Sequence, residues 1–281
     1  MSGLCQQIDP AMWSELLKNI DTVIFDADGV LWWGMDAILG SPELIEQVAA
    51  MVIGMACTLR LFNDDIVSPP AICVEVLQQM ELTKPKVYVI GYQGLKDELG
   101  LSGFQYIGDG PDHFENYSET EFLYDVPLDP EVGAVIVGYD SHFNYVKLMK
   151  AANYLRDPKC LFITNNDDST FRKPNQKFTI PKTAAIVVAV TTVVQREPLV
   201  VGKPHITTYN YIRAHWNIDP KRTLIVGDRC NTDIKFGVDH GMKTMLVLSG
   251  VHTLADVDKF RKEDRKDFLP DFYAGKLGDL L

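Results

Sequence analysis

The feature that most constrains the fold of this chain is a series of short β-branched runs separated by helical patterns. Seven such runs recur along the sequence, at residues 22–25, 86–90, 134–137, 161–164, 199–201, 223–226 and 244–248. Strands this uniformly apolar are buried on both faces, and their alternation with helices is typical of a parallel sheet covered by helices on each side. The clearest helical patterns are at residues 206–216 and 232–240. We therefore expect an α/β fold built on a parallel sheet.

The middle of the chain differs in composition from the rest and indicates an inserted module. Residues from about Gly100 to Pro130 are rich in Gly, Asp, Glu and aromatic residues, and they lie between two stronger strand signals. A compact domain seldom contains a structureless loop of this length. We therefore expect an α/β module over residues 75–190 with its own small sheet, inserted into a core domain made from residues 1–74 and 191–281.

Charge and cysteine usage exclude several classes of protein. The formal net charge of −11 argues against a broad positive face for nucleic acid or anionic membranes, so an anionic substrate requires local positive charge or a metal. The five cysteines are odd in number and form no CxxC pair, which argues against a disulfide framework and a structural zinc site. No basic segment leads into an apolar run at the N-terminus, and the apolar stretches are too short to span a bilayer. We expect a cytoplasmic protein.

Acidic side chains follow two of the expected strands. In TVIFDADG, Asp26 and Asp28 follow the strand. In TLIVGDRCNTD, Asp228 follows the strand, and Asp233 lies five residues further on. Ligands of open α/β sheets bind beyond the carboxyl ends of the strands, so these carboxylates are expected to meet there. Like charges held close together need a cation, and oxygen ligands at a site that handles phosphate favour Mg²⁺. The alternatives are local: Asp and Gly also favour turns, and Asp233 could be a favourable first-turn acid.

A lysine lies between these two motifs in chain order. Lys203 follows the apolar strand of LVVGKP and lies between Gly202 and Pro204. We expect its ammonium group to emerge at the same edge as the carboxylates, where it would supply the positive charge that the acidic composition lacks. The alternative is an ordinary exposed surface lysine.

Taken in order, DADGV, GKP and GDRCNTD resemble the motifs of the haloacid dehalogenase (HAD) superfamily of phosphohydrolases. The strings DGVLW, VGYDSHFNYVKLMKAANYL, GMKTMLVLSGV and LPDFY narrow the resemblance to the phosphoglycolate phosphatase, pyridoxal phosphatase and 4-nitrophenylphosphatase group. The resemblance implies a Rossmann-like parallel-sheet core with an inserted α/β cap domain. It also implies Mg²⁺-dependent hydrolysis of a small phosphorylated metabolite, such as phosphoglycolate or pyridoxal phosphate, and is consistent with a homodimer formed through the cap.

The resemblance further implies roles for the individual residues. Asp26 would be the nucleophile that forms an aspartyl-phosphate, and Asp28 would act as general acid and base. Mg²⁺ would be held by the carboxylates of Asp26 and Asp228 and by the backbone carbonyl of Asp28. Lys203 would stabilise the charge of the nucleophile and the phosphate, and Asp233 would support the metal site or Lys203.

The sequence departs from the family between Ala50 and Ser68. The family has there a Thr or Ser followed by Asn-Asn-Ser, which grips the transferred phosphate, whereas this chain offers only Thr58 as a nearby hydroxyl. A similar string, FITNNDDS, follows the cap signature, so we interpret Thr164, Asn165 and Asn166 as cap residues. The departure leaves two alternatives: a catalytically weak or inactive HAD-like protein with a binding or regulatory role, or a truncated gene model.

Overall fold

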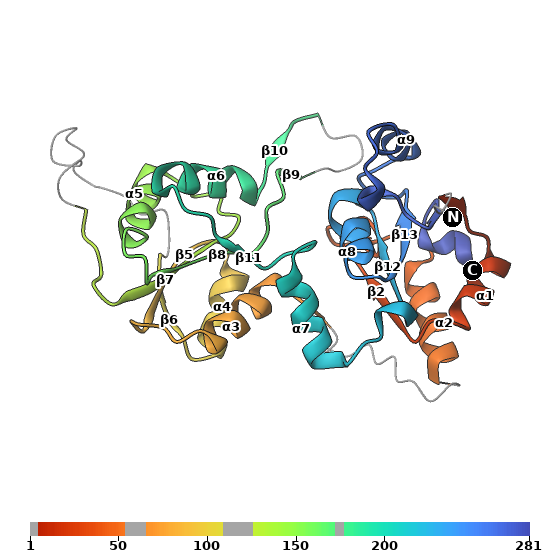
Figure 1. Ribbon diagram of the computed structural model, residues 1–281, viewed down its shortest axis with the longest axis horizontal. Helices are drawn as coiled ribbons and strands as arrows, with labels where there is room; N and C mark the ends of the chain where they lie inside the picture. Colours follow the sequence, from red (N-terminus) through yellow and green to blue (C-terminus); the bar gives the residue numbers. More distant parts are fainter. Residues whose placement is uncertain (1–4, 54–65, 109–125, 172–176) are drawn as a thin grey trace. The chain divides into compact units, whose positions relative to one another are not determined.

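The computed structural model of the chain describes residues 5–53, 66–108, 126–171 and 177–281. The chain divides into two compact units (Figure 1), of which the first comprises Met1–Ile66, Arg172–Lys177 and Lys203–Leu281, and the second comprises Val67–Phe171 and Phe178–Gly202. The sequence predicted boundaries near residues 75 and 190. The contacts instead place the segments around residues 67–74 and 191–202 with the second unit.

The first unit contains a five-stranded sheet in which every neighbouring pair is parallel. Its order is β1 (Gln6–Gln7), β14 (Phe272–Ala274), β13 (Lys243–Val247), β12 (Thr223–Gly227) and β2 (Thr22–Phe25). At the end of the row, Phe25 of β2 lies opposite Val226 of β12. The two strands therefore end side by side, which brings the residues that follow them to one edge of the sheet.

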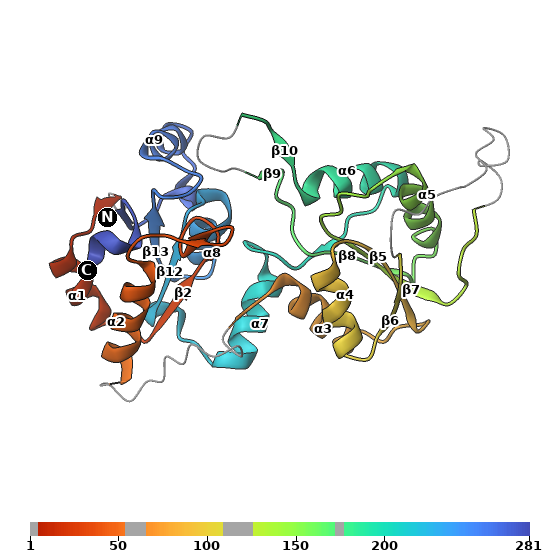
Figure 2. The same cartoon turned by 180° about the vertical axis from the view of Figure 1, so that it is seen from behind.

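Helices cover both faces of this sheet. α1 (Pro10–Leu17) and α2 (Ser41–Ile53) lie on one side, and α8 (Lys235–Asp239) lies on the other (Figures 1 and 2). On the α1 and α2 side, buried Trp13 and Leu44 belong to one apolar core with alternate residues of β12 and β13. Successive side chains of a strand point to opposite faces of the sheet, and both faces are buried here. The strands are therefore continuous apolar runs in the sequence.

Gly237 allows α8 to pack directly on the other face of the sheet. A Cβ atom at this position would lie 2.4 Å from Cγ2 of Thr244 and 2.6 Å from Cγ2 of Ile225. Any larger residue would therefore push the helix away from β12 and β13. This close packing fixes the helix that continues the turn after β12.

The remaining elements of the first unit connect these layers. They are the antiparallel hairpin β3 (Trp32–Trp33) and β4 (Asp36–Ala37), α7 (Ile206–Trp216), α9 (Leu254–Lys262), a π-helical turn (Cys230–Ile234) and 3₁₀ turns at Pro220–Arg222, Lys266–Phe268 and Leu277–Leu280. The sequence predicted α7 with its observed bounds. It also predicted one helix over residues 232–240, whereas the chain forms the π-helical turn before α8.

The second unit has its own five-stranded parallel sheet. Its order is β11 (Leu199–Val200), β8 (Leu161–Thr164), β7 (Val132–Val137), β5 (Lys86–Ile90) and β6 (Gln105–Ile107). α5 (Tyr145–Tyr154) and α6 (Thr183–Val194) cover one face, α3 (Pro69–Gln79) and α4 (Gln93–Leu101) cover the other, and β9 (Thr170–Phe171) pairs with β10 (Ile180–Pro181) (Figures 1 and 2).

The predicted α/β class with parallel sheets is confirmed. All seven predicted strands are present, with ends displaced by two residues or fewer. Within the described ranges, no helix is long and apolar enough to cross a bilayer. The four cysteines that the structure describes are free thiols.

Candidate active site

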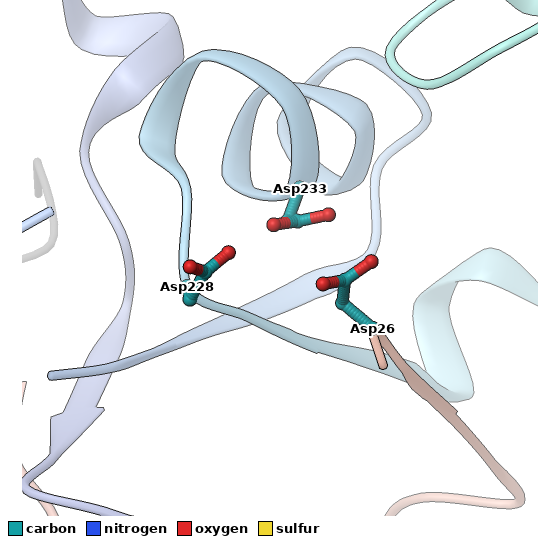
Figure 3. A group of neighbouring side chains, drawn as sticks. All are labelled: Asp26, Asp228 and Asp233. Atoms are coloured by element: carbon teal, nitrogen blue, oxygen red, sulfur yellow. The ribbon is translucent and has the colours of Figure 1, made fainter. Parts of the chain in front are cut away.

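Three carboxylates point toward one another at the carboxyl edge of the first sheet (Figure 3). Asp26 directly follows β2, Asp228 directly follows β12, and Asp233 belongs to the π-helical turn after β12. One oxygen from each side chain lies within 4.8 Å of the other two. Asp228 and Asp233 are buried, whereas the Asp26 side chain is 26% exposed. The structure thus brings together three of the four acids that the sequence predicted would meet at this edge.

The last residue of β12 explains how Asp233 reaches the cluster. A Cβ atom on Gly227 would lie 2.1 Å from Cβ of Asp233, so only glycine allows the turn to fold back over the strand end. The backbone N–H of Arg229 donates to Oδ2 of Asp233 at 3.1 Å and fixes the carboxylate in this position. The π-helical geometry, which is often found at functional sites, therefore places a third acid beside the two strand-end acids.

Lys203 joins two of the three acids. Its Nζ lies 2.8 Å from Oδ1 of Asp26 and 2.6 Å from Oδ1 of Asp233. The ammonium group therefore lies at the predicted edge. The preceding strand, β11, pairs with β8 in the second unit, and Lys203 is the first residue after that unit rather than the end of a strand in the first sheet.

The cluster carries more negative than positive charge. Burial raises the pKa of Asp228 to about 7, and the neighbouring Asp233 and Asp26 carboxylates act in the same direction. Burial also raises the pKa of Asp233 to about 6, although Lys203 opposes this shift. For Lys203, burial lowers the pKa, but the attraction of Asp233 and Asp26 outweighs it and holds the pKa above its ordinary value. One lysine thus faces three acids.

The oxygens that remain available fit a divalent cation. Both oxygens of Asp233 accept hydrogen bonds, one from Lys203 and one from the backbone N–H of Arg229. Oδ1 of Asp26 also accepts a hydrogen bond from Lys203. Oδ2 of Asp228 accepts the backbone N–H of Val251 at 2.8 Å. Within the described part of the chain, no donor contacts the second oxygen of Asp26 or of Asp228. Hard carboxylate oxygens with uncompensated negative charge are suitable ligands for Mg²⁺.

Asp28 lies outside the three-carboxylate cluster. Its side chain is exposed, and its backbone pairs with Trp32 at the start of the β3–β4 hairpin. The next residue, Gly29, has φ of +88°, and a Cβ atom there would lie 2.6 Å from Oδ2 of Asp228. The loop that carries Asp28 is therefore packed directly against Asp228 while the Asp28 carboxylate remains open to solvent.

The two candidates for the phosphate-gripping residue have different outcomes. Thr58 lies outside the described residues. Thr164 ends β8 in the second unit, where its hydroxyl oxygen lies 2.8 Å from the carbonyl of Val137 and 2.9 Å from that of Asn166. Thr164 and the two asparagines after it thus belong to the second unit, as interpreted from the sequence. No Thr-Asn-Asn segment follows a strand of the first sheet in the portion that the structure describes.

Sequence reasoning missed the contribution of residues 249–252, which follow β13. Val251 donates its backbone N–H to Asp228, and the hydroxyl of Ser249 donates to the carbonyl of Gly29 at 2.7 Å. The sequence GMKTMLVLSGV contributes to the family resemblance, but no local pattern in it predicts a role at the site. The signal that points to this segment is topological, because β13 is the parallel neighbour of β12 and ends at the same edge.

The chain is similar to known proteins over nearly its whole length. A family model described as HAD-hydrolase-like matches residues 200–280. The chain is similar to a glycerol-3-phosphate phosphatase of Homo sapiens, with 34% identity covering 99% of this chain and 95% of the relative. It is also similar to phosphoglycolate phosphatase 1A, chloroplastic, of Arabidopsis thaliana, with 35% identity covering 98% and 80%. A glycerol phosphate phosphatase from Mycobacterium tuberculosis, solved in complex with magnesium, has the same fold with a TM-score of 0.69, 21% identity and coverage of 94% and 78%.

Proposed function

Because the chain belongs to the HAD-like hydrolases and is a phosphatase, we propose that it hydrolyses the phosphomonoester of a small metabolite in a Mg²⁺-dependent reaction. The observation that carries this proposal is the cluster of Asp26, Asp228 and Asp233, whose ligand oxygens lie within 4.8 Å of one another and whose charge Lys203 only partly balances. Phosphoryl transfer depends chiefly on positioning and charge neutralisation, which this arrangement supplies.

The two acids after β2 would perform the two halves of the reaction. In the first half, a carboxylate oxygen of Asp26 attacks phosphorus, the bond to the leaving oxygen breaks, and Asp28 gives that oxygen its proton. In the second half, Asp28 takes a proton from a water molecule, which attacks the aspartyl-phosphate and releases inorganic phosphate with Asp26 restored. The exposed position of Asp28 suits exchange of protons with substrate and water.

Asp26 and Asp228 are the residues that would hold Mg²⁺, together with the backbone carbonyl of Asp28, and Asp233 would support them. When bound, the cation neutralises negative charge on the transferred phosphoryl group. Lys203 would stabilise the remaining charge from the side of Asp26, and Asp233 holds the ammonium group in that place at 2.6 Å. The relative solved in complex with magnesium supports the choice of cation.

The proposed substrates are small phosphomonoesters of the kind for which the relatives are named, such as glycerol 3-phosphate and phosphoglycolate. The sequence left open a catalytically weak or inactive binding protein, because the phosphate-gripping motif is not evident between Ala50 and Ser68. Full-length similarity to named phosphatases favours the active enzyme.

Hydrolysis of 4-nitrophenyl phosphate with and without Mg²⁺ tests the proposal. The wild-type protein is expected to release phosphate only with the cation, and Asp26→Asn is expected to lower kcat by at least about 10³-fold because an amide is not a nucleophile. Asp36→Asn is a matched control, since Asp36 is an exposed acid of the neighbouring hairpin outside the cluster. Its rate should stay within about twofold of the wild type. A wild-type protein no faster than Asp26→Asn would overturn the proposal.

We also propose that the protein forms a homodimer through α6 of the second unit. This helix contains no charged residue, and its Val188 and Val193 are 60% and 56% exposed. Exposed apolar side chains favour association, and a two-fold dimer would cover them with the same helix of a second copy. Light scattering after gel filtration is expected to give a dimer mass for the wild type and a monomer mass for Val188→Glu/Val193→Glu. A monomeric wild type contradicts this proposal.

A further inference from the structure

We propose that Ser249 is a positioning residue: with residues 250–252, it holds the loop after Asp26 against Asp228 and thereby sets the affinity of the carboxylate cluster for Mg²⁺. This inference rests on the proposed function, because it concerns the same cluster. The segment follows β13, the parallel neighbour of β12, and runs to the beginning of α9.

Ser249 contacts the loop that carries the two acids after β2. The hydroxyl of Ser249 donates to the backbone carbonyl of Gly29 at 2.7 Å. In return, the indole Nε1 of Trp33 donates to the backbone carbonyl of Ser249 at 3.1 Å. Ser249 thus binds the loop at two points, one directly after Asp28 and one in the β3–β4 hairpin.

The residues after Ser249 contact Asp228. The backbone N–H of Val251 donates to Oδ2 of Asp228 at 2.8 Å, and the backbone N–H of His252 donates to the carbonyl of Asp228 at 3.0 Å. The Nδ1 atom of His252 in turn accepts the backbone N–H of Cys230 at 2.8 Å. The segment therefore fixes both the carboxylate of Asp228 and the start of the turn that leads to Asp233.

Close packing joins this loop to Asp228. A Cβ atom on Gly250 would lie 2.1 Å from Oδ2 of Asp228, and a Cβ atom on Gly29 would lie 2.6 Å from the same oxygen and 3.1 Å from Cα of Gly250. The two glycines and the carboxylate leave no room for a further atom. A shift of the loop that carries Asp26 and Asp28 is therefore transmitted directly to Asp228. The hydrogen bond of the Ser249 side chain limits that shift.

Removal of the Ser249 hydroxyl leaves the Gly29 carbonyl without this donor and frees the loop to move relative to Asp228. Loss of a group that orients metal ligands typically lowers metal affinity by 10- to 100-fold. Because Ser249 acts through Gly29 rather than on a ligand directly, we expect Ser249→Ala to raise the Mg²⁺ dissociation constant by about 10-fold, the lower end of that range. Catalysis at saturating Mg²⁺ should change much less.

The direct readout is calorimetric titration of Mg²⁺ into the metal-free full-length protein. Ser249→Ala is compared with Ser249→Thr, which keeps the hydroxyl, and with Trp33→Phe, which keeps an aromatic ring but removes the indole N–H that Ser249 accepts. The matched control is Thr223→Val, because the buried Thr223 hydroxyl also donates to a backbone carbonyl, that of Asp219 at 2.7 Å, but from the opposite end of β12.

Weaker Mg²⁺ binding by Ser249→Ala and Trp33→Phe supports the proposal if Ser249→Thr restores the affinity and Thr223→Val keeps it while losing thermal stability. Wild-type affinity in both Ser249→Ala and Trp33→Phe overturns it. If Ser249→Ala does not fold, Trp33→Phe alone decides between these results. Failure of the proposed function is distinguishable, because the wild-type protein would then show no Mg²⁺ binding or no hydrolysis of 4-nitrophenyl phosphate.

Discussion

Each unit of the molecule contains a group of buried charges, and the two groups differ in their charge balance. In the second unit, Nζ of Lys147 lies 2.5 Å from Oδ2 of Asp140, and the two side chains are only 2% and 3% exposed. The other oxygen of Asp140 accepts the backbone N–H of His142 at 2.8 Å. In the first unit, Lys203 contacts two of the three clustered carboxylates, and one oxygen each of Asp26 and Asp228 has no protein donor in the described part of the chain.

Burial of charge alone therefore does not identify a functional site. Asp140 and Lys147 satisfy one another, so their removal from water is compensated inside the protein. The acids of the first unit are not fully compensated, and the pKa of Asp228 is raised chiefly by burial and then by its acidic neighbours. An unbalanced group of this kind is stabilised by a cation, whereas a balanced pair has no need of one.

The largest expected effect on stability comes from breaking the balanced pair. Lys147→Met leaves Asp140 buried without its partner, which should lower the free energy of unfolding by about 3–5 kcal/mol. Chemical denaturation measures this change. The double variant Asp140→Leu/Lys147→Met should recover most of the loss, because a buried ion pair can be replaced by apolar residues at little cost. Equal losses in the single and double variants would contradict the idea that the pair is balanced.

Neutralising one acid of the first unit should have the opposite sign. Without Mg²⁺ at pH 8, Asp228→Asn removes a buried charge that two other carboxylates repel, so the free energy of unfolding should rise by on the order of 1–2 kcal/mol. The same variant should lose the stabilisation that Mg²⁺ gives the wild type. Thermal unfolding with and without Mg²⁺ measures both. A metal-free Asp228→Asn protein less stable than the wild type would contradict the claim of unbalanced charge.

The pH dependence of the free energy of unfolding should come from the first unit. The pKa of Asp228 is raised from 3.8 to about 7, so the folded state holds this proton more tightly than the unfolded state. The stability contributed by that proton is fully present below about pH 4 and is lost as the pH rises through about 7. Between pH 5 and pH 7.5 the loss should be about 2 kcal/mol in the metal-free protein, and Asp228→Asn should reduce it. An unchanged profile in that variant would assign the dependence to other groups.

The strands and the strand-end acids were predictable because both depend on local sequence. Uniform apolar runs identified β2 and β12, and parallel strands necessarily bring Asp26 and Asp228 to one edge. The short strands β1 and β14 were not predicted. β1 has two exposed residues, and β14 is a three-residue strand that depends on pairing with β13 rather than on a pattern of its own.

The rest of the site depends on tertiary contacts that no local pattern encodes. The approach of Asp233 requires the absence of a Cβ atom at Gly227, and the π-helical turn departs from the helix that the periodicity indicated. Lys203 reaches the acids after a strand that pairs in the other unit. The hydrogen bond from Ser249 to Gly29 joins residues 220 positions apart in the sequence. These features arise from the way distant segments pack.

Calorimetric titration of Mg²⁺ into the metal-free wild-type protein at pH 7.5, in two buffers of different ionisation enthalpy, tests the claim of an uncompensated carboxylate site most directly. The expected result is one Mg²⁺ bound per chain, with release of a fraction of a proton because Asp228, whose pKa is raised to about 7, must ionise, and loss of binding in Asp228→Asn. The contradictory result is no saturable binding by the wild type, or binding by Asp228→Asn with wild-type affinity.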